Sequence, residues 1–511
     1  MNALELSRAL GGVDEKLVED AAPEGRVYDK ERITRPVRIW RIAAPVALLV
    51  ALAILLHSVL PKNVPGPVNK AYALEVAEYP AVPNLVEYLT KQDALWEELG
   101  QGKISYEELN TQMSALDVQY AHTLSEAQTY ERRIRAMQGA GKGLEAFFTD
   151  SAAAVLTGAG SENRVYSPLN TYLALAMLAE LTDGSSRAQI LSLLGADSIE
   201  TLRTRANHIW NANYRDDGFS KCVPAGSVWL NESYPLKEEP LQTLATNYYS
   251  SSFRGEMGSR GYLDCMKDWL GENTGGMLDE QAGDLTMEPN DALILLSTLF
   301  YEAAWGEKFR AEDNEPGVFH APGGDVPAEY MFQSGYGFYY YGERFSAVEK
   351  IMVDSSRMWF ILPDEGVGMD ELLADGEYRK FVRITMQPNV SWNQSRNVTV
   401  NLRLPKFDVS SGMDLAGTLR TMGVTDCFDP ERSDFTPLSG ETLWVGRVQH
   451  DARLTVDEQG VRAAAYTAAS LKAEAEPPEE EVDFFLDRPF TFLLVSADDV
   501  PLYTGVVNQP Q

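Results

Sequence analysis

The sequence Asn163-Arg164-Val165-Tyr166-Ser167-Pro168-Leu169, followed by Ala174-Leu175-Ala176-Met177-Leu178, lies near the start of the largest globular part of the chain. It opens an expected helical stretch over residues 167–194, which follows another over residues 144–156. From Gly143 onward, helical stretches alternate with short segments rich in β-forming residues. The strand candidates are residues 293–299, 358–362, 398–404, 490–495 and 502–507. This pattern predicts a mixed α+β domain over residues 143–511, with its carboxyl end in a sheet.

Further short sequences follow in order along this domain. They are Gly184-Ser185-Ser186-Arg187-Ala188-Gln189-Ile190-Leu191, Trp269-Leu270-Gly271-Glu272-Asn273-Thr274-Gly275-Gly276, Leu299-Phe300-Tyr301-Glu302-Ala303-Ala304-Trp305 closed by Phe309, Leu404-Pro405-Lys406-Phe407, residues 419–428, and Asp487-Arg488-Pro489-Phe490 with Gly505-Val506-Val507-Asn508. Together with residues 163–178, these sequences resemble the motifs of the serpin family of protease inhibitors. The resemblance implies an α+β serpin fold, with three β-sheets, surrounding helices and an exposed reactive-centre loop. It also implies a protein that is not an enzyme and needs no cofactor.

The composition excludes several classes of function. The chain has 511 residues, with 75 Asp and Glu against 44 Lys and Arg, and a formal net charge of −31. Nucleic acid is not expected as a partner, because its phosphates are bound by clustered basic side chains. The chain has 5 His, and its 3 Cys include no Cys-x-x-Cys pair. These counts argue against a metal site, a disulfide framework and a Ser-His-Asp hydrolase, and we expect the cysteines to be small apolar side chains.

Residues 42–60 have the composition of a membrane-spanning helix. They lack acidic and basic side chains apart from His57, and at about 1.5 Å per residue they nearly cross a hydrocarbon core of about 30 Å. A cleaved signal peptide fits less well, because a long stretch precedes the run and no small-x-small site follows it. The preceding flank is rich in Arg, whereas the following flank offers Lys62 and then Lys70. The positive-inside rule therefore predicts a single-pass protein of the cell membrane, with residues 1–41 in the cytoplasm and the remainder extracellular.

Residues 61–142 are expected to form an extracellular linker and a helical stalk. The Pro-rich residues 61–68 predict an extended spacer. One helix is expected over residues 84–99, and a second begins with a capping box at Ser105-Tyr106-Glu107-Glu108. The apolar side chains of the second helix recur at nearly a 4,3 spacing. That stripe fits either a dimerising coiled coil or a helix that packs on the following domain or acts as a stalk.

The serpin resemblance assigns the hinge of the reactive-centre loop to Val456-Asp457-Glu458-Gln459-Gly460-Val461-Arg462-Ala463-Ala464-Ala465-Tyr466-Thr467-Ala468-Ala469. Gly460 suits the start of a loop that must refold, because glycine reaches backbone angles that other residues do not. Side chains alternate between the two faces of a strand, so an inward Val461 would place every second side chain after it inward. Those side chains, from Ala463 to Leu471, are small or apolar, whereas Arg462 and Tyr466 fall on the opposite face. This alternation favours insertion into a sheet over a flexible Ala-rich linker. The implied hinge residues are Glu458, Gly460, Val461, Ala463, Ala464, Ala465 and Thr467.

The reactive bond is placed by the spacing that the resemblance implies. Counting forward from Glu458, and the downstream Pro477-Pro478-Glu479, both indicate Glu474–Ala475, with Ala473–Glu474 as the next choice. A Glu before the bond suits a protease with a basic recognition pocket, and cleavage after Ala473 or Ala475 suits an elastase-like enzyme. The acidic residues between 474 and 483 could steer basic proteases, although such charge runs are more often simply solvated.

The resemblance also implies a sheet-opening cluster of Ser167, Pro168, Ser297, His450 and Trp305. Ser167, Pro168 and His450 occupy the positions of a small polar group beneath the main sheet, and Trp305 matches a position at the top of that sheet. Ser297 stands where the family usually has Asn. A buried histidine is generally a hydrogen-bonded structural group, so we expect His450 to be structural.

Taken together, the sequence predicts a suicide-substrate inhibitor of extracellular serine or cysteine proteases, which traps the acyl-enzyme by inserting its cleaved loop into the main sheet. The expected partners are an elastase-like or Glu-specific protease and, through residues 42–60, the membrane, with a monomeric serpin domain. The tail, the anchor and the lack of a disulfide pattern resemble surface serpins of Gram-positive bacteria. One alternative is a non-inhibitory serpin that acts as a surface binder or chaperone-like protein, which the bulky Tyr466 favours. An anchored hydrolase is disfavoured, because no Gly-x-Ser-x-Gly sequence is present.

Overall fold

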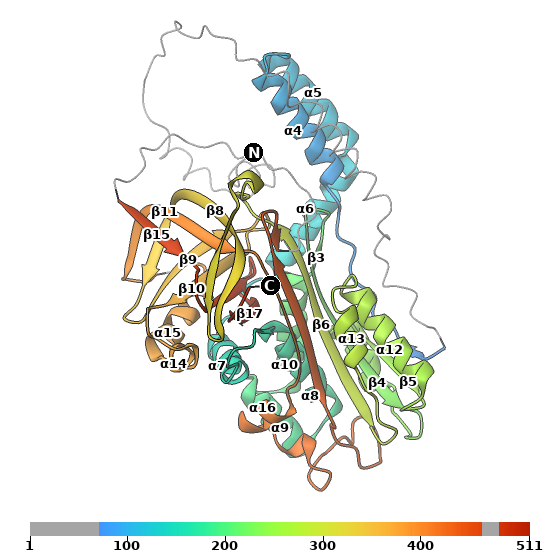
Figure 1. Cartoon of the computed structure of the whole chain (residues 1–511). Coiled ribbons are helices and arrows are strands. Elements are labelled where there is room, and N and C mark those ends of the chain that lie inside the picture. Colours follow the sequence, from blue (N-terminus) through green and yellow to red (C-terminus); the bar gives the residue numbers. More distant parts are fainter. Residues whose placement is uncertain (1–70, 390, 462–479, 511) are drawn as a thin grey trace, which may run out of the picture. The chain divides into compact units, whose positions relative to one another are not determined.

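The centre of the fold is an eight-stranded sheet, hereafter the central sheet, with strand order β1-β5-β4-β6-β14-β13-β12 and with β3 paired to β4. The computed structural model in which it is seen describes residues 71–389, 391–461 and 480–510 (Figure 1). The strands of the central sheet are β1 (Ala73–Glu75), β3 (Arg215–Asp216), β4 (Ser220–Asn231), β5 (Ser250–Gly255), β6 (Leu293–Ala304), β12 (Phe407–Asp414), β13 (Val448–Val456) and β14 (Gly460–Val461).

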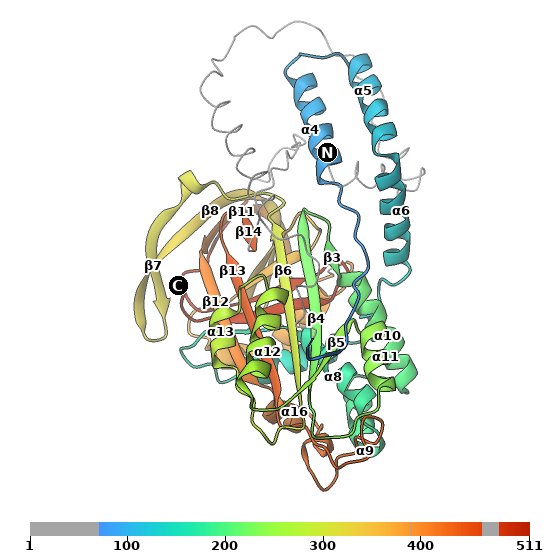
Figure 2. The ribbon, with the colours of Figure 1, turned by 90° about the vertical axis from the view of Figure 1, so that its right-hand side faces the viewer.

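The central sheet is packed against helices on both of its faces (Figure 2). Every residue of β6 except Glu302 is buried, as is typical of a strand that is covered on both sides. One face packs on α8 (Pro168–Leu181), all of whose residues are buried. The other face packs on α12 (Arg260–Asn273) and α13 (Asp279–Asp284), through a core cluster that includes Trp229 stacked at 4.2 Å on Phe253.

A second sheet has nine strands, in the order β15-β11-β8-β9-β10-β16-β17-β2, with β7 paired to β8. The sequence analysis expected three sheets, and the structure has two hydrogen-bonded sheets, because β8 joins two of the expected three. β8 pairs with β11 along most of its length and then with β9 through Tyr339, Tyr340 and Tyr341, so hydrogen bonds join two of the expected sheets. The strands of this second sheet are β2 (Arg164–Tyr166), β7 (Glu315–Ala321), β8 (Gly324–Tyr341), β9 (Phe345–Ile351), β10 (Arg357–Pro363), β11 (Ser395–Pro405), β15 (Glu481–Phe485), β16 (Phe490–Val495) and β17 (Pro501–Val507).

The strand candidates of the carboxyl-terminal half are confirmed, whereas one expected helix is divided. Each of the five candidate segments lies within β6, β10, β11, β16 or β17, and most of the strands extend further. The helical stretch expected over residues 167–194 is two helices, because the backbone is extended at Thr182 and Asp183, and Gly184 then begins α9 with a φ of 54°. The remaining helices are α7 (Glu145–Leu156), α9 (Gly184–Leu193), α10 (Ile199–Asn213), α11 (Glu239–Asn247), α14 (Met369–Ala374), α15 (Gly376–Thr385) and α16 (Ala416–Thr421), with 3₁₀-helices η1 (Ala311–Asp313) and η2 (Asp426–Phe428).

The residues before the large domain form α4 (Val86–Gly100), α5 (Tyr106–Gln119) and α6 (Ala121–Arg135). The predicted capping box is present: the Ser105 hydroxyl accepts from the Glu108 N–H, and the Glu108 carboxylate accepts from the Ser105 N–H. The second predicted helix is interrupted at Tyr120, which lies between α5 and α6.

The apolar stripe of these helices is buried within the same chain. Tyr88 of α4 packs on the Tyr120 ring at 5.7 Å and donates to Asp117 of α5 at 2.7 Å. Tyr130 of α6 donates to the Tyr214 carbonyl at 2.9 Å, just after α10. α4 and α5 therefore pack on each other, and α6 contacts the following domain.

The segment just before α4 extends the central sheet. β1 pairs antiparallel with β5, through Ala73 with Phe253 and Glu75 with Ser252. Beyond it, the ring of Tyr79 lies among three other rings, at 5.3 to 6.3 Å. The three rings are those of Trp210, Tyr214 and Tyr249. Sequence patterns did not indicate the strand β1.

Two further expectations concern the membrane and the cysteines. Within residues 71–389, 391–461 and 480–510, no helix is both long and apolar enough to cross a membrane. The segment expected to do so, residues 42–60, lies outside these described ranges. Cys222, Cys265 and Cys427 are buried and form no disulfide, which fits the prediction that they are small apolar side chains.

Candidate functional site

A tight turn between β13 and β14 holds the start of the predicted loop. Val456, the last residue of β13, pairs with Val461 of β14. The Asp457 carboxylate accepts hydrogen bonds from the backbone N–H groups of Gln459, at 2.7 Å, and of Gly460, at 3.2 Å. The Asp457 N–H in turn donates to the Gly460 carbonyl at 3.1 Å. An Asp that bonds the backbone ahead of it is a common device for fixing such a turn.

β14 is already inserted between β6 and β13. The absence of a side chain at Gly460 lets the backbone of β14 lie close to that of β6. Gly460 pairs with Ala304 of β6, and Val461 pairs with Ala303. The φ of Gly460 is 155°, and a Cβ at this position would overlap the Ala303 carbonyl oxygen and lie 2.8 Å from the Ala304 Cα. Val461 is only 2% exposed and belongs to the main core. The side chain of Val461 therefore points inward, which was the premise of the predicted alternation.

Below β14, the two flanking strands diverge. In the described part of the chain, β6 and β13 pair directly only through residues 295–297 and 448–450. At about 3.3 Å per residue, Ser297 and Ala303 lie about 20 Å apart along β6. Residues 298–302 and 451–455 therefore face each other without a ladder between them, beneath the two residues of β14.

Trp305, the residue after β6, holds the turn in place through hydrogen bonds. Its indole Nε1 donates to the Asp457 carbonyl at 2.8 Å, and its backbone N–H donates to the Gln459 carbonyl at 2.9 Å. The Phe309 N–H donates to the Glu458 carbonyl at 3.2 Å, and the Phe309 ring lies edge-on to the Trp305 ring at 6.1 Å. Trp305 is 1% exposed. Three carbonyl groups of the hinge turn are therefore held, one by the Trp305 indole and two by the backbone N–H groups of Trp305 and Phe309.

Glu458 is held by polar groups from two other segments. The Lys406 ammonium lies 2.7 Å from its carboxylate, and the Asn314 amide donates to it as well. Burial by itself would raise the pKa of Glu458, but the hydrogen bonds from Lys406, from the backbone and from Asn314 together hold that pKa below its ordinary value. The Lys406 pKa is raised: burial alone would lower it, and hydrogen bonds to Glu458 and Glu329 outweigh that effect. The pair is ionised at neutral pH.

A second polar group lies where β6 and β13 still pair with each other. His450 is opposite Ser297 in the ladder, and its Nε2 accepts a hydrogen bond from the Ser167 N–H at 3.1 Å. Burial lowers the pKa of His450 to about 4, because the imidazolium would lose its hydration. His450 is therefore a neutral, hydrogen-bonded group. Ser167 caps α8 by accepting from the Asn170 N–H, with Pro168 at the first helical position.

Asn170 is a member of this group that sequence reasoning missed. The Ser297 hydroxyl donates to the Asn170 side-chain oxygen and lies 3.4 Å from the Asn170 backbone carbonyl. The side-chain nitrogen of Asn170 is buried and has no hydrogen-bond partner among the described residues. The only available signal was its position in the opening motif, three residues after Ser167, which places both residues in the first turn of α8.

The predicted sheet-opening cluster divides into two places. Ser297 and His450, within the central sheet, lie together with Ser167 and Pro168 at the start of α8, whereas Trp305 contacts the hinge turn just after the end of β6. The two ends are separated because Ser297 and Trp305 are eight positions apart along an extended segment. The contacts of Glu458 with Lys406 and Asn314 had not been predicted either.

Much of the predicted loop lies outside the described residues. Of the implied hinge, the structure describes Glu458, Gly460 and Val461. The remaining hinge residues, and both residues of the predicted reactive bond, fall in the undescribed range. These are Ala463, Ala464, Ala465 and Thr467, with Glu474 and Ala475 of the bond.

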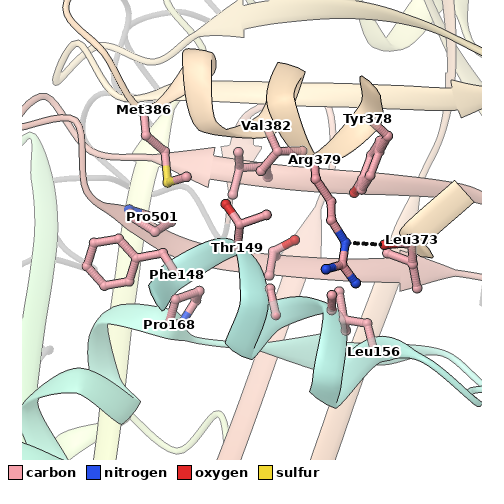
Figure 3. Close-up of a pocket in the computed structure, with 14 residues that line it drawn as sticks. Phe148, Thr149, Leu156, Pro168, Leu373, Tyr378, Arg379, Val382, Met386 and Pro501 are labelled. Atoms are coloured by element: carbon pink, nitrogen blue, oxygen red, sulfur yellow. Dashed lines mark hydrogen bonds between the residues drawn. The ribbon is translucent and has the colours of Figure 1, made fainter. Parts of the chain in front are cut away.

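A small pocket lies between α7, α15 and the second sheet (Figure 3). It is lined mainly by apolar side chains, with Phe148 and Pro168 on one side and Met386 and Val382 on another. Arg379 lines it too, but its Nε donates to the Leu373 carbonyl at 2.9 Å. The pocket has a volume of about 20 Å³, hardly more than one water needs.

Comparison with known proteins agrees with this geometry. Residues 143–510 match the family model described as serpin (serine protease inhibitor). Serpin-ZX of Arabidopsis thaliana is 28% identical over 372 residues, which cover 69% of this chain and 92% of the relative. An uncharacterized serpin-like protein of Thermococcus kodakarensis is 27% identical, covering 69% of this chain and 82% of its own.

Solved structures give the same result. The native-state crystal structure of the thermophilic serpin tengpin superposes with a TM-score of 0.63 and 25% identity, covering 71% of this chain and 92% of tengpin. The native stressed conformation of Arabidopsis AtSerpin1 gives 0.64 at 24% identity, covering 72% and 97%. Because the family model matches well over half of the residues, this chain belongs to the serpin family, whose members are non-enzymatic and typically protease inhibitors.

Proposed function

We propose that this chain is a suicide-substrate inhibitor of extracellular serine or cysteine proteases. The observation that carries the proposal is the position of β14: its two residues already lie between β6 and β13, and Val461 points into the core. A longer strand can follow the same path, because the facing edges of β6 and β13 below β14 are not joined by a ladder. Strand addition of this kind satisfies backbone hydrogen bonds along both edges.

The side chains of the loop suit this path. If the strand continues beyond Val461, residues 463, 465 and 467 share its face, and they are Ala, Ala and Thr. Small side chains fit above α8, which fills the space beneath the central sheet with buried side chains. The bulky Arg462 and Tyr466 would lie on the opposite face.

The chemistry of trapping begins in the protease. Its Ser or Cys nucleophile attacks the carbonyl carbon of Glu474, the bond to the Ala475 nitrogen breaks, and that nitrogen leaves as a protonated amine. The acyl-enzyme then carries the hinge side of the loop, and its insertion as a strand would draw the bound protease away before water can release it. This sequence of events needs a free loop end and a receptive sheet, and no catalytic group of this chain.

The target and the bond are proposed from the loop sequence. Glu474–Ala475 suits a Glu-specific protease, and cleavage after Ala473 or Ala475 suits an elastase-like one. We also propose that residues 42–60 anchor the chain in a cell membrane, with residues 1–41 in the cytoplasm and the serpin domain outside, as in surface serpins of bacterial type. The sign of the flanking charges supports this orientation.

Trapping can be tested with the full chain in mild detergent. It is mixed with an elastase, a Glu-specific protease, trypsin and a papain-like protease, and analysed on denaturing gels and by mass spectrometry. We expect a complex that survives boiling, at the sum of both masses less the released peptide, and a peptide that begins at Ala475. Complete cleavage by each protease with no such complex would contradict the inhibitory function.

A non-inhibitory role is the second candidate, and Tyr466 is the residue that favours it, because a bulky side chain in the loop could hinder insertion. A small-molecule carrier is not supported by the pocket of Figure 3, since about 20 Å³ is far below the roughly 300–1,000 Å³ of ligand sites. A wider cavity of about 480 Å³, lined among others by Arg164, Ser411 and Asp414, lies within that range, so both a carrier and a protein that binds other proteins remain. Either would be cleaved in its loop without gaining stability.

A further inference from the structure

The second sheet exposes aromatic side chains beside the end of the reactive-centre loop. Tyr336, Phe338 and Phe332 project from the same face of β8, with exposed fractions of 64%, 49% and 39%. The strand alternates, so its intervening residues face the other way. On that other face, β11 buries Val398, Val400 and Leu402. The exposed rings are therefore not needed to fill the core.

The register of the sheet places two of these rings near the loop. Tyr336 pairs with Thr399 of β11, and Thr399 pairs with Glu481, the first residue of β15. Phe338 pairs with Asn397, one row further toward the point where the chain enters β15. Two strand spacings, about 10 Å, separate β8 from β15. Figure 1 shows β15, β11 and β8 side by side.

The third ring, Phe332, lies at the other end of the same face. It pairs with Arg403, which pairs with Phe485, the last residue of β15. Phe332 is six residues from Phe338, about 20 Å along β8. β8 thus carries two exposed rings near the start of β15, Tyr336 and Phe338, and one exposed ring far from it, Phe332, which can serve as a control.

Polar side chains hold the near rows in place and make them acidic. The Asn397 amide donates to the Tyr336 hydroxyl. On the next row, the Asn401 amide donates to the Asp483 carboxylate at 2.9 Å. Glu481 is exposed on the row of Tyr336. The face therefore combines fixed aromatic surface with negative charge.

We infer that Tyr336 and Phe338, with the acidic start of β15, form a second docking surface for the protease that attacks the loop. The inference rests on the proposed function. Protease–inhibitor complexes bury about 800 Å² on each partner, so the protease covers surface around its cleft as well as the loop within it. The aromatic face is continuous with β15, where the loop ends, and therefore lies beside a protease bound on the loop. Exposed aromatic clusters of this kind are typical of interaction sites.

The charge specifies the complementary surface. Glu481 and Asp483 would meet a basic rim beside the protease's active-site cleft, and the rings would meet an apolar patch within that rim. Such complementarity chiefly accelerates encounter, so the rate of association should carry the effect.

The test uses the full chain in detergent and a protease that it traps. The double variant Tyr336→Ala/Phe338→Ala is compared with Phe332→Ala, which removes a ring from the same strand and face away from the loop. We expect the double variant to lower the second-order rate of complex formation roughly tenfold or more, with the stoichiometry of inhibition unchanged. The Phe332→Ala rate should stay within about twofold. Binding of the same protease with its nucleophile replaced by Ala should weaken in parallel, since this step involves no insertion.

Three outcomes would overturn the inference. One is a double variant that folds, as its melting curve shows, and traps the protease at the rate of the unaltered chain. Another is an unaltered chain that self-associates in sedimentation while the double variant does not, which would assign the face to a second copy. The third is an unaltered chain that neither traps nor binds any protease of the panel. The third outcome would contradict the proposed function itself, whereas the first would contradict only the docking surface.

Discussion

The Ser297 hydroxyl on β6 donates its hydrogen bond to the side-chain oxygen of Asn170 on α8. The resemblance to serpins implies an Asn at the position of Ser297, so the sequence predicted a polar group without an amide beneath the sheet. The amide is present after all, but it comes from the helix instead of the strand. This exchange preserves a polar link between α8 and the strand that must separate from β13 if a new strand enters.

We predict that Asn170→Ala lowers the free energy of unfolding by about 1 to 3 kcal/mol, because the buried Ser297 hydroxyl loses its side-chain acceptor and keeps only the longer contact with the Asn170 carbonyl. The exchange variant Asn170→Ser/Ser297→Asn should recover most of that loss, since it returns the amide from the other side. Urea unfolding of the two variants and the unaltered chain measures both effects. Equal stability of all three would mean that the contact contributes nothing.

Gly460 should tolerate no side chain. We predict that Gly460→Ala destabilises the native chain by about 1 to 3 kcal/mol, because the added Cβ would overlap the Ala303 carbonyl and the backbone is in a left-handed region. Gly440→Ala is the matched control, since a Cβ there meets nothing within 4 Å. If the two variants unfold at the same urea concentration, the close approach of β14 to β6 is not real.

The Glu458–Lys406 pair should make the hinge sensitive to acid. The Glu458 pKa is held below its ordinary value, so the pair stabilises the chain above that value, and the contribution is lost as the pH falls through the lowered pKa. Glu458→Gln should therefore be less stable than the unaltered chain at pH 7, and the difference should shrink below about pH 4. Unfolding measured across this range checks it. A difference that grows toward low pH would have the wrong sign.

His450 gives a separate pH dependence at higher pH. Its folded-state pKa of about 4 lies below the value of about 6.5 expected for an unfolded chain, so the unfolded state binds the proton more readily. Stability should fall as the pH drops from about 6.5 to 4, by about 3 kcal/mol in all. In His450→Gln this slope should be absent. A variant that keeps the slope would assign the acid sensitivity to other groups.

Local sequence patterns predicted elements that local interactions determine. The capping box at Ser105 is present because its two hydrogen bonds lie within four residues. The β-forming residues from Leu293 to Leu299 predicted a strand, and β6 contains them. The break between α8 and α9 was not predicted, because apolar periodicity does not reveal the extended backbone of Thr182 and Asp183.

Elements that depend on distant partners could not be predicted in this way. β14 has two residues and β1 has three, and each is a strand only because another strand lies beside it. The contacts that Trp305 makes with the hinge turn also come from a distant segment, since its indole donates to the Asp457 carbonyl. The salt bridge of Glu458 with Lys406 likewise joins segments that only the fold brings together.

The central claim is that the loop beyond Val461 can enter between β6 and β13, and a melting experiment after loop cleavage tests it most directly. The full chain is cut in the loop by a protease that it does not trap, and the melting temperatures of intact and cut chain are compared. Ala465→Glu places a charge on the face of Val461, and Ala464→Glu places it on the opposite face as a control. The account predicts that the unaltered chain and Ala464→Glu melt well above their intact forms after cleavage, whereas Ala465→Glu gains little. Equal melting temperatures for the intact and cut unaltered chain would contradict insertion.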